Sequence, residues 1–143
     1  MDKAFLIEKL REDLAREMTH MTFYLKNSAT LKGLHRQEIR ELFLEEAASE
    51  MKHVQEFQDL IIGLGGKIDD VKVRDQDIFL YNDPQAAVKY AWMMENEVVT
   101  KYTERIKQAE ELGGPDGQYV EIFLEDQLAH SRADADNLKL LGA

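Results

Sequence analysis

Apolar residues recur every three or four positions along four long stretches of this chain, a spacing that gives an α-helix one apolar face. The expected helices run from about Lys3 to Lys32, from about His35 to Ile62, from Asp83-Pro84 to Leu112, and from Pro115-Asp116 to about Leu141. Glycines separate the helices, and Asp83 followed by Pro84 is a typical helix start. The pattern therefore predicts an all-α protein.

The lengths of the connections predict how the helices are arranged. The first two helices and the last two are joined by short turns, which favours two antiparallel hairpins. The connection over residues 67–83 is long enough to run the length of a bundle, and its irregular pattern does not choose between a short helix and an extended segment. We expect residues 1–143 to form a single four-helix-bundle domain with one long crossover.

Polar residues with metal-binding donors interrupt the middle of every apolar stripe. They are Glu17 in the first helix, Glu46, Glu50 and His53 in the second, Glu95 in the third, and Gln127, His130 or Ser131, and Asp134 in the fourth. Tyr24 follows Glu17 by two helical turns, and Tyr102 follows Glu95 by the same distance. The two hairpins thus have equivalent patterns, with polar residues at matching heights, which chance interruptions would not be expected to share.

The chemistry of these side chains suggests why they are buried together. An isolated carboxylate is very costly to bury, whereas three glutamates and two histidines holding two divalent cations would be largely neutralised. Oxygen and imidazole donors suit iron or manganese, and they also accept zinc. A nearby tyrosine can hydrogen-bond a ligating carboxylate and orient it.

Each feature also has a simpler interpretation when taken alone. A Glu-x-x-His pair is common on solvated helix faces, and core tyrosines often have a satisfied hydroxyl group. Glu46 and Asp134 can be read as solvated carboxylates at the rim. His20 and His35 fall off the apolar stripes, so we expect both at the surface. The conjunction across four helices favours the metal site, because bundle sites are built from facing inward residues.

Composition excludes several classes of function. The 143 residues are 44% hydrophobic and 32% charged, as in a globular protein, and the net charge of −10 disfavours nucleic acid as a partner. There is no cysteine, which excludes disulfides, thiolate metal sites and thiol catalysis. The N-terminal stretch lacks the pattern of a signal peptide and no run is long enough to span a membrane, so we expect a cytoplasmic protein.

Three stretches resemble the bacterioferritin type of the ferritin-like superfamily: "REMTHMTFYL", "EEAASEMKH" and "IFLEDQLAHSRAD", the last of which keeps the histidine and the preceding acidic pair. The third helix matches more loosely, through Glu95, Tyr102 and Ile106. The resemblance implies a ferritin-like four-helix bundle with a di-iron ferroxidase centre. It makes Glu17 and Glu95 terminal ligands and Glu50 a bridging ligand, with His53 and His130 completing the two irons and Tyr24 relaying an electron. The implied reaction is oxidation of Fe(II) by dioxygen or peroxide, for iron storage or detoxification.

The chain departs from this family pattern in two places. Gln127 stands where a bridging glutamate is expected, and an amide is a weaker, neutral ligand; Asp126 and Asp134 are the nearby acids that could replace it. The sequence ends with "NLKLLGA", so we do not expect the further short helix of bacterioferritins, and a dimer and a larger shell both remain open.

Met51 occupies the position at which bacterioferritins ligate haem between two subunits. The alternative is that it fills an interface, as methionine often does. Its helix has a second apolar face made of Leu44, Ala48, Met51, Val54 (with Ala47) and Ile61, which predicts a homodimer packed through the first two helices.

Two other classes of function remain open. One is a non-cage di-iron oxidase or peroxidase of the rubrerythrin type, which would need an external reductant because the chain has no cysteine. The other is a structural bundle whose metal site is degenerate at Gln127.

Overall fold

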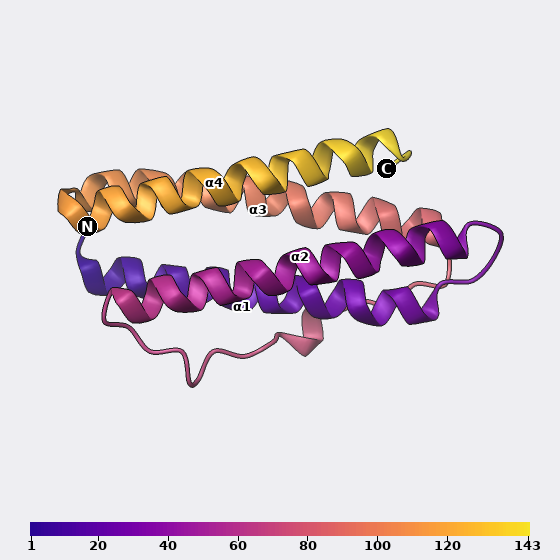
Figure 1. The fold of residues 1–143 in the computed structure, drawn as a ribbon, viewed down its shortest axis with the longest axis horizontal. Coiled ribbons are helices and arrows are strands. Elements are labelled where there is room, and N and C mark those ends of the chain that lie inside the picture. The colour runs from indigo at the N-terminus through magenta and orange to yellow at the C-terminus, as the bar shows by residue number, and fades with distance from the viewer.

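The structure is a computed structural model that describes residues 1–143 and consists of four long helices (Figure 1). The helices are α1 (Lys3–Thr30), α2 (Arg36–Gly63), α3 (Pro84–Leu112) and α4 (Gly114–Leu140), and a short 3-10 turn, η1 (Asp75–Asp77), lies in the crossover. There is no β-strand. The predicted all-α four-helix bundle with one long crossover is confirmed, and no helix end differs from its predicted position by more than two residues.

The helix ends follow from local chemistry. The carboxylate of Asp83 accepts a hydrogen bond from the backbone N–H of Gln85 at 3.2 Å, and Pro84 occupies the first turn of α3, as predicted. Gly113 ends α3 with a φ of 65°, a left-handed conformation that costs glycine little, and α4 begins at the next residue. Gly117 is also required, since a Cβ there would lie 2.5 Å from the carbonyl oxygen of Ala109. These glycines allow α3 and α4 to fold back on each other almost without a loop.

Two antiparallel hairpins, α1–α2 and α3–α4, pack side by side, and α1 runs antiparallel to α3 (Figure 1). The helices within each hairpin pack together more extensively than the hairpins pack with each other. The crossover runs along α1 and is fixed to it by side chains. Asn27 donates from Nδ2 to the carbonyl of Phe79 and accepts from the N–H of Tyr81, at 2.9 and 2.8 Å, while Thr19 accepts from the N–H of Arg74 at 2.9 Å.

The apolar core is divided into two clusters with a polar layer between them. One cluster contains Leu6, Leu10, Leu14, Phe57, Leu60, Val98, Val120 and Leu124, and the other contains Phe23, Phe43, Ala87, Val88, Ala91, Met94 and Leu138. Burying each of the larger side chains contributes roughly 1.5–3 kcal/mol. The two clusters close off the middle of the bundle from both ends, and the polar residues predicted from the sequence lie in that middle layer.

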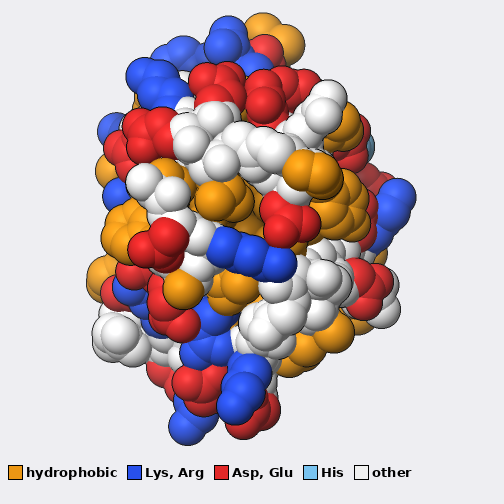
Figure 2. All heavy atoms as spheres, turned by 90° about the vertical axis from the view of Figure 1, so that its left-hand side faces the viewer, with side chains coloured by type: hydrophobic (Ala, Val, Ile, Leu, Met, Phe, Trp, Pro, Cys, Tyr) orange, Lys and Arg blue, Asp and Glu red, His pale blue; other side chains and the backbone are white.

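The charged surface shows no concentration of one sign at the end of the bundle where α3 turns into α4. Figure 2 shows that acidic and basic side chains alternate around this end, with apolar atoms between them. None of the helices combines the length and the apolarity needed to cross a membrane.

Candidate metal centre

Two glutamate–tyrosine pairs link α1 to α3 reciprocally. Tyr24 of α1 donates a hydrogen bond from its hydroxyl group to Oε1 of Glu95 at 3.0 Å, and Tyr102 of α3 donates to Oε1 of Glu17. Each tyrosine follows the glutamate of its own helix by two turns. Because α1 and α3 are antiparallel, each tyrosine therefore lies opposite the glutamate of the other helix. All four side chains are buried, so each carboxylate is held in one orientation and keeps one oxygen for another partner.

A first group of potential ligands consists of Glu17, Glu50 and His53, whose donor atoms all lie within 4.8 Å of one another. Nδ1 of His53 lies 3.6 Å from Oε2 of Glu17 and 3.7 Å from Oε1 of Glu50. Glu50 and His53 are one turn apart on α2 and therefore project from the same face. Two carboxylates and one imidazole, all buried, thus bring together donors of the types that bind a divalent cation.

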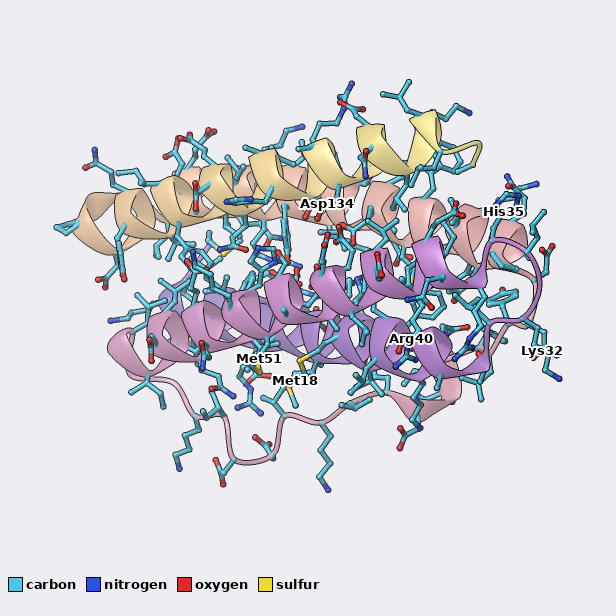
Figure 3. All side chains as sticks on the ribbon, turned by 45° about the vertical axis from the view of Figure 1, so that its right-hand side comes forward. Met18, Lys32, His35, Arg40, Met51 and Asp134 are labelled. Carbon is cyan, nitrogen blue, oxygen red and sulfur yellow. The ribbon has the colours of Figure 1, made fainter.

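A second group of potential ligands consists of Glu46, Glu50, Glu95 and Asp134, again within 4.8 Å of one another. These residues come from α2, α3 and α4, and Glu50 belongs to both groups. Glu46 and Asp134 are half-buried, whereas Glu50 and Glu95 are fully buried. Figure 3 shows Asp134 projecting from α4 toward the space between the hairpins.

The side chains of this layer have hydrogen-bonding atoms that nothing in the protein satisfies. In the whole chain seven buried side-chain nitrogen or oxygen atoms lack a hydrogen-bond partner, and five of them are Oε2 of Glu17, Oε2 of Glu46, Oε2 of Glu50, Nδ1 of His53 and Oε1 of Gln127. Buried polar atoms are almost always paired, because leaving one unpaired costs about 1–3 kcal/mol. Four lone-pair oxygens and one imidazole nitrogen together fit divalent cations.

Burial and mutual repulsion make most of these carboxyl groups hard to ionise in the absence of a cation. Burial, with a contribution from Glu17, raises the pKa of Glu50 and of Glu95 well above the usual range. Burial and the neighbouring Asp134 raise the pKa of Glu46 to about 8. A bound cation would replace the protons that these groups otherwise hold.

Glu17 differs from its neighbours. Burial opposes its ionisation, but the Glu50 carboxyl group and His53 outweigh that effect and lower the pKa of Glu17 to about 2. Burial also opposes the ionisation of His53 and so lowers its pKa. Glu17 raises the pKa of His53 by more, so the net shift is upward. The first group therefore holds one firmly ionised carboxylate.

The fourth helix contributes less than the sequence predicts. Gln127 is buried in the middle layer, but the imidazole of His130 is exposed, and Ser131 takes the inward position beside it. The ring centroid of His130 lies 5.6 Å from that of His53, so His130 is at the edge of the layer and outside both ligand groups. Asp126 is exposed and does not replace Gln127, whereas Asp134 does reach the layer.

A family model described as the ferritin-like domain matches residues 7–141. The chain belongs to the ferritin-like domain family. A ferritin-like, diiron-carboxylate protein from Bacillus anthracis str. Ames superposes with a TM-score of 0.86 and 30% identity, over 99% of this chain and 97% of that one. The recognition made from the sequence is therefore confirmed, together with the fold.

Two bacterioferritins also share the fold, at lower identity. Mycobacterium tuberculosis BfrA gives a TM-score of 0.82 at 18% identity, over 95% of this chain and 82% of that one. Rhodobacter capsulatus bacterioferritin, solved with a metal-free dinuclear site and a haem iron, gives 0.83 at 18%, over 96% and 82%. A comparison with curated protein sequences finds no match.

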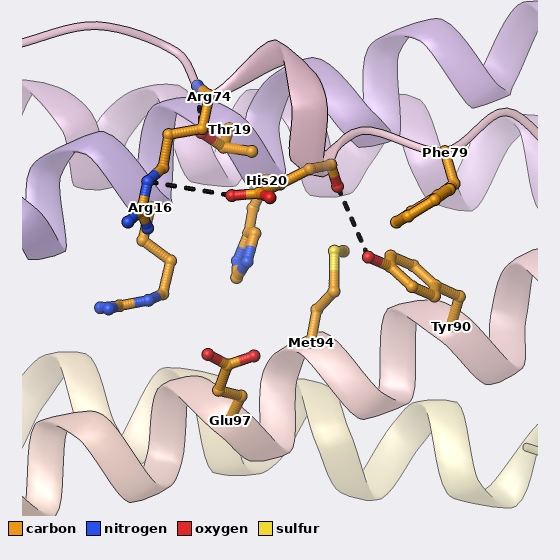
Figure 4. Close-up of a pocket in the computed structure, with 9 residues that line it drawn as sticks. Arg16, Thr19, His20, Arg74, Phe79, Tyr90, Met94 and Glu97 are labelled. Carbon is orange, nitrogen blue, oxygen red and sulfur yellow. Dashed lines mark hydrogen bonds and ion pairs between the residues drawn. The ribbon is translucent and has the colours of Figure 1, made fainter.

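The expectation that His20 lies at the surface of this ferritin-like chain was wrong. His20 is buried and its Nδ1 has no hydrogen-bond partner, because the crossover covers α1 at this height. Burial lowers the pKa of His20 to about 4. The side chain borders a cavity of about 250 Å³, shown in Figure 4, which is lined by Arg16, Thr19, His20, Arg74, Asp77, Phe79, Tyr90, Met94 and Glu97. His35 is exposed, as expected.

A buried ion pair between Asp13 and Arg105 adjoins the layer and was not predicted. It joins α1 to α3 one turn away from the Tyr102–Glu17 hydrogen bond, and Arg16 also donates to Asp13 at 2.9 Å. Neither residue shows a pattern that would reveal the pairing, since they are 92 positions apart in the sequence.

The second apolar face predicted for α2 is narrower than expected. Met51 is 53% exposed, and Leu44 and Ala48 are also exposed, but Val54 and Ile61 pack inside the bundle. Met51 of α2 is exposed, whereas Met18 of α1, also labelled in Figure 3, is half-buried against the apolar core. The second apolar face of α2 in this ferritin-like chain is therefore a short exposed strip made of Leu44, Ala48 and Met51.

Proposed function

We propose that this chain binds two iron ions between its hairpins and oxidises Fe(II) with dioxygen or hydrogen peroxide, for storage or detoxification of iron. The observation that carries the proposal is the set of unpartnered, buried donor atoms on Glu17, Glu50 and His53, beside the buried Glu95. The diiron-carboxylate character of the Bacillus anthracis relative supports the same conclusion. Manganese or zinc would fit the same donors.

The ligands divide between the two ions. Glu17, Glu50 and His53 would hold the first ion and Glu95 the second, and Glu50 is the residue common to both groups of potential ligands. The family resemblance adds Gln127 and His130 as neutral donors to the second ion. Tyr102 and Tyr24 orient Glu17 and Glu95 through their hydroxyl groups. When bound, the ions supply one electron each to the oxidant.

The reaction balances without a further reductant. Two Fe(II) become two Fe(III), while dioxygen takes up two electrons and two protons to give hydrogen peroxide, or hydrogen peroxide takes up the same number to give two waters. Carboxyl groups that hold protons before the cations arrive can release them as the cations bind.

Tyr24 is proposed to relay an electron from Fe(II) in the site to the oxidant, losing one electron and regaining one, so that the balance above is unchanged. Its hydroxyl group donates to Glu95, so the phenol has an acceptor for its proton when it loses an electron. At saturating iron, we expect Tyr24→Phe to slow Fe(II) oxidation at least tenfold and Tyr102→Phe to leave the rate near that of the wild type. Equal rates in the two variants would remove the relay role, since each loses one equivalent hydrogen bond.

The function is tested by loading the chain with Fe(II) without oxygen, admitting air, and measuring iron per chain together with particle size by light scattering. Two Fe(II) oxidised per chain support the site, and accumulation far beyond two in a large particle supports storage. A dimer that oxidises two Fe(II) and stops would instead support the non-cage oxidase. Absence of binding, with Glu50→Ala leaving stability unchanged, would identify a structural bundle.

We also propose a homodimer that covers the strip around Met51, because an exposed apolar strip on α2 gains stability by burial against a second copy. Haem ligation by Met51 belongs to the same proposal. Haem titrated into the protein should give an absorption band that Met51→Leu abolishes, and an unchanged band would exclude this ligand. Met51→Glu places a charge in the strip. If the dimer forms there, this variant should have half the wild-type particle mass by light scattering.

A further inference from the structure

We propose that the second metal ion lies among Glu46, Glu50, Glu95 and Asp134, and that Glu46 and Asp134 supply the negative charge that Gln127 lacks. The inference rests on the proposed two-ion function and concerns which residues hold the second ion. It gives this chain an ion position displaced from Gln127 and His130, toward the half-buried side of the layer.

The geometry of the four carboxylates fits a single cation. Each offers one oxygen, and these oxygens all lie within 4.8 Å of one another. Ligating carboxylate oxygens lie roughly 2.0–2.2 Å from a divalent first-row ion, so two oxygens on opposite sides of it are about 4.4 Å apart. A contraction of a few tenths of an ångström would bring all four into range.

The unpartnered oxygens point to an ion rather than to an accidental cluster of acids. Glu50 is only 2% exposed, and its Oε2 has no hydrogen-bond partner, nor does Oε2 of Glu46. Glu46 on α2 and Asp134 on α4 approach each other across the two hairpins although both are acidic. Two ionised carboxylates at this distance repel each other, so the approach requires a proton or a cation between them, and a cation would also satisfy the unpartnered oxygens.

The residues that the family pattern would assign fit less well. Gln127 has a neutral side chain, and the imidazole of His130 is exposed and outside both groups of ligands. With Glu17, Glu50 and Glu95 alone, two Fe(III) would carry a large uncompensated positive charge in a closed layer. Adding Glu46 and Asp134 gives five carboxylates, which better match the oxidised pair of ions.

The test measures binding without turnover, with Co(II) as the probe under nitrogen, by native mass spectrometry and by the absorption of bound Co(II). We expect two Co(II) per wild-type chain, and a second Co(II) at least tenfold weaker in Asp134→Asn. Asp136→Asn is the matched control, since Asp136 lies on the same helix, is exposed and pairs with Arg132 at 3.0 Å. Glu46→Gln should weaken the second Co(II) like Asp134→Asn, and it replaces that variant if Asp134→Asn does not fold.

The outcomes separate this inference from the proposed function. If both variants keep the second Co(II) at wild-type affinity while His130→Ala loses it, the second ion lies at His130; this inference then fails and the two-ion function stands. If the wild-type chain binds no Co(II), both fail.

Discussion

The guanidinium group of Arg105 lies side-on against the carboxylate of Asp13, with Nε 2.7 Å from Oδ2 and Nη2 3.0 Å from Oδ1, buried between α3 and α1. Removing one member of such a pair leaves the other charge buried and uncompensated. We therefore expect Arg105→Met to lower the free energy of unfolding by about 3–5 kcal/mol, measured by urea denaturation at pH 7. Arg132→Met, which breaks an exposed pair, should change it by less than about 0.5 kcal/mol. Similar losses in the two variants would contradict a special role for the buried pair.

The tyrosines should tune metal affinity separately for the two ions. Tyr102→Phe removes the donor to Glu17 and Tyr24→Phe the donor to Glu95, so each is expected to weaken one of the two bound ions by about 10–100-fold. Competition between the protein and a chelator for Co(II) measures both constants. Tyr119→Phe is the control, because Tyr119 is exposed. If both Co(II) dissociation constants are unchanged in Tyr102→Phe or in Tyr24→Phe, the hydroxyl group of that tyrosine does not orient a ligand.

Glu50→Gln should have opposite effects on the metal-free and metal-bound forms. The folded-state pKa of Glu50 is raised, so the wild-type, metal-free chain loses stability as the pH rises above the ordinary carboxyl range, and the neutral amide avoids that loss. At pH 7 without metal we expect the variant to be about 1–2 kcal/mol more stable. Wild type should gain about 2.7 kcal/mol at free Co(II) a hundred times the dissociation constant, and the variant should lose most of this gain.

Thermal unfolding with and without Co(II) measures both effects. Glu45→Gln changes an exposed neighbouring carboxylate and should behave as the wild type. A metal-free Glu50→Gln protein that unfolds more easily than the wild type would mean that the carboxylate is structural.

His20 should make the fold sensitive to acid. Its folded-state pKa is lowered to about 4, so the unfolded chain binds a proton first and stability falls as the pH drops from about 6.5 to about 4. The loss is at most about 1.4 kcal/mol per pH unit. His20→Gln should remove this component from urea midpoints measured across that range, relative to His35→Gln at an exposed position. If the urea midpoints of His20→Gln and His35→Gln change with pH in the same way, His20 does not contribute to the acid sensitivity.

The sequence predicts the helices well because periodicity, caps and glycines act locally, as at Asp83 and Gly113. It also places Glu50 and His53 together on the inner face, since residues three positions apart on a helix project from the same face. The choice between His130 and Ser131 could not be made, because adjacent residues lie on either side of the stripe and only packing fixes the rotation of α4.

The remaining errors involve contacts between distant segments. The burial of His20 depends on the path of the crossover, which has no periodic pattern to predict it. The Asp13–Arg105 pair depends on the register of α1 against α3, and nothing local in either helix specifies that register. Asp134 looked like a solvated residue because only the approach of α2 to α4 gives it carboxylate neighbours.

The acidic layer also lies where the molecule is least cohesive, since the helices within each hairpin pack together more extensively than the two hairpins do. Cations bound by residues of α1, α2, α3 and α4 would hold the α1–α2 hairpin and the α3–α4 hairpin together. On losing them, we expect the hairpins to part before either hairpin unwinds, so that amide hydrogen exchange rises first where the hairpins meet. If the proposed iron ions are those cations, iron supply would then govern how long each chain survives proteolysis.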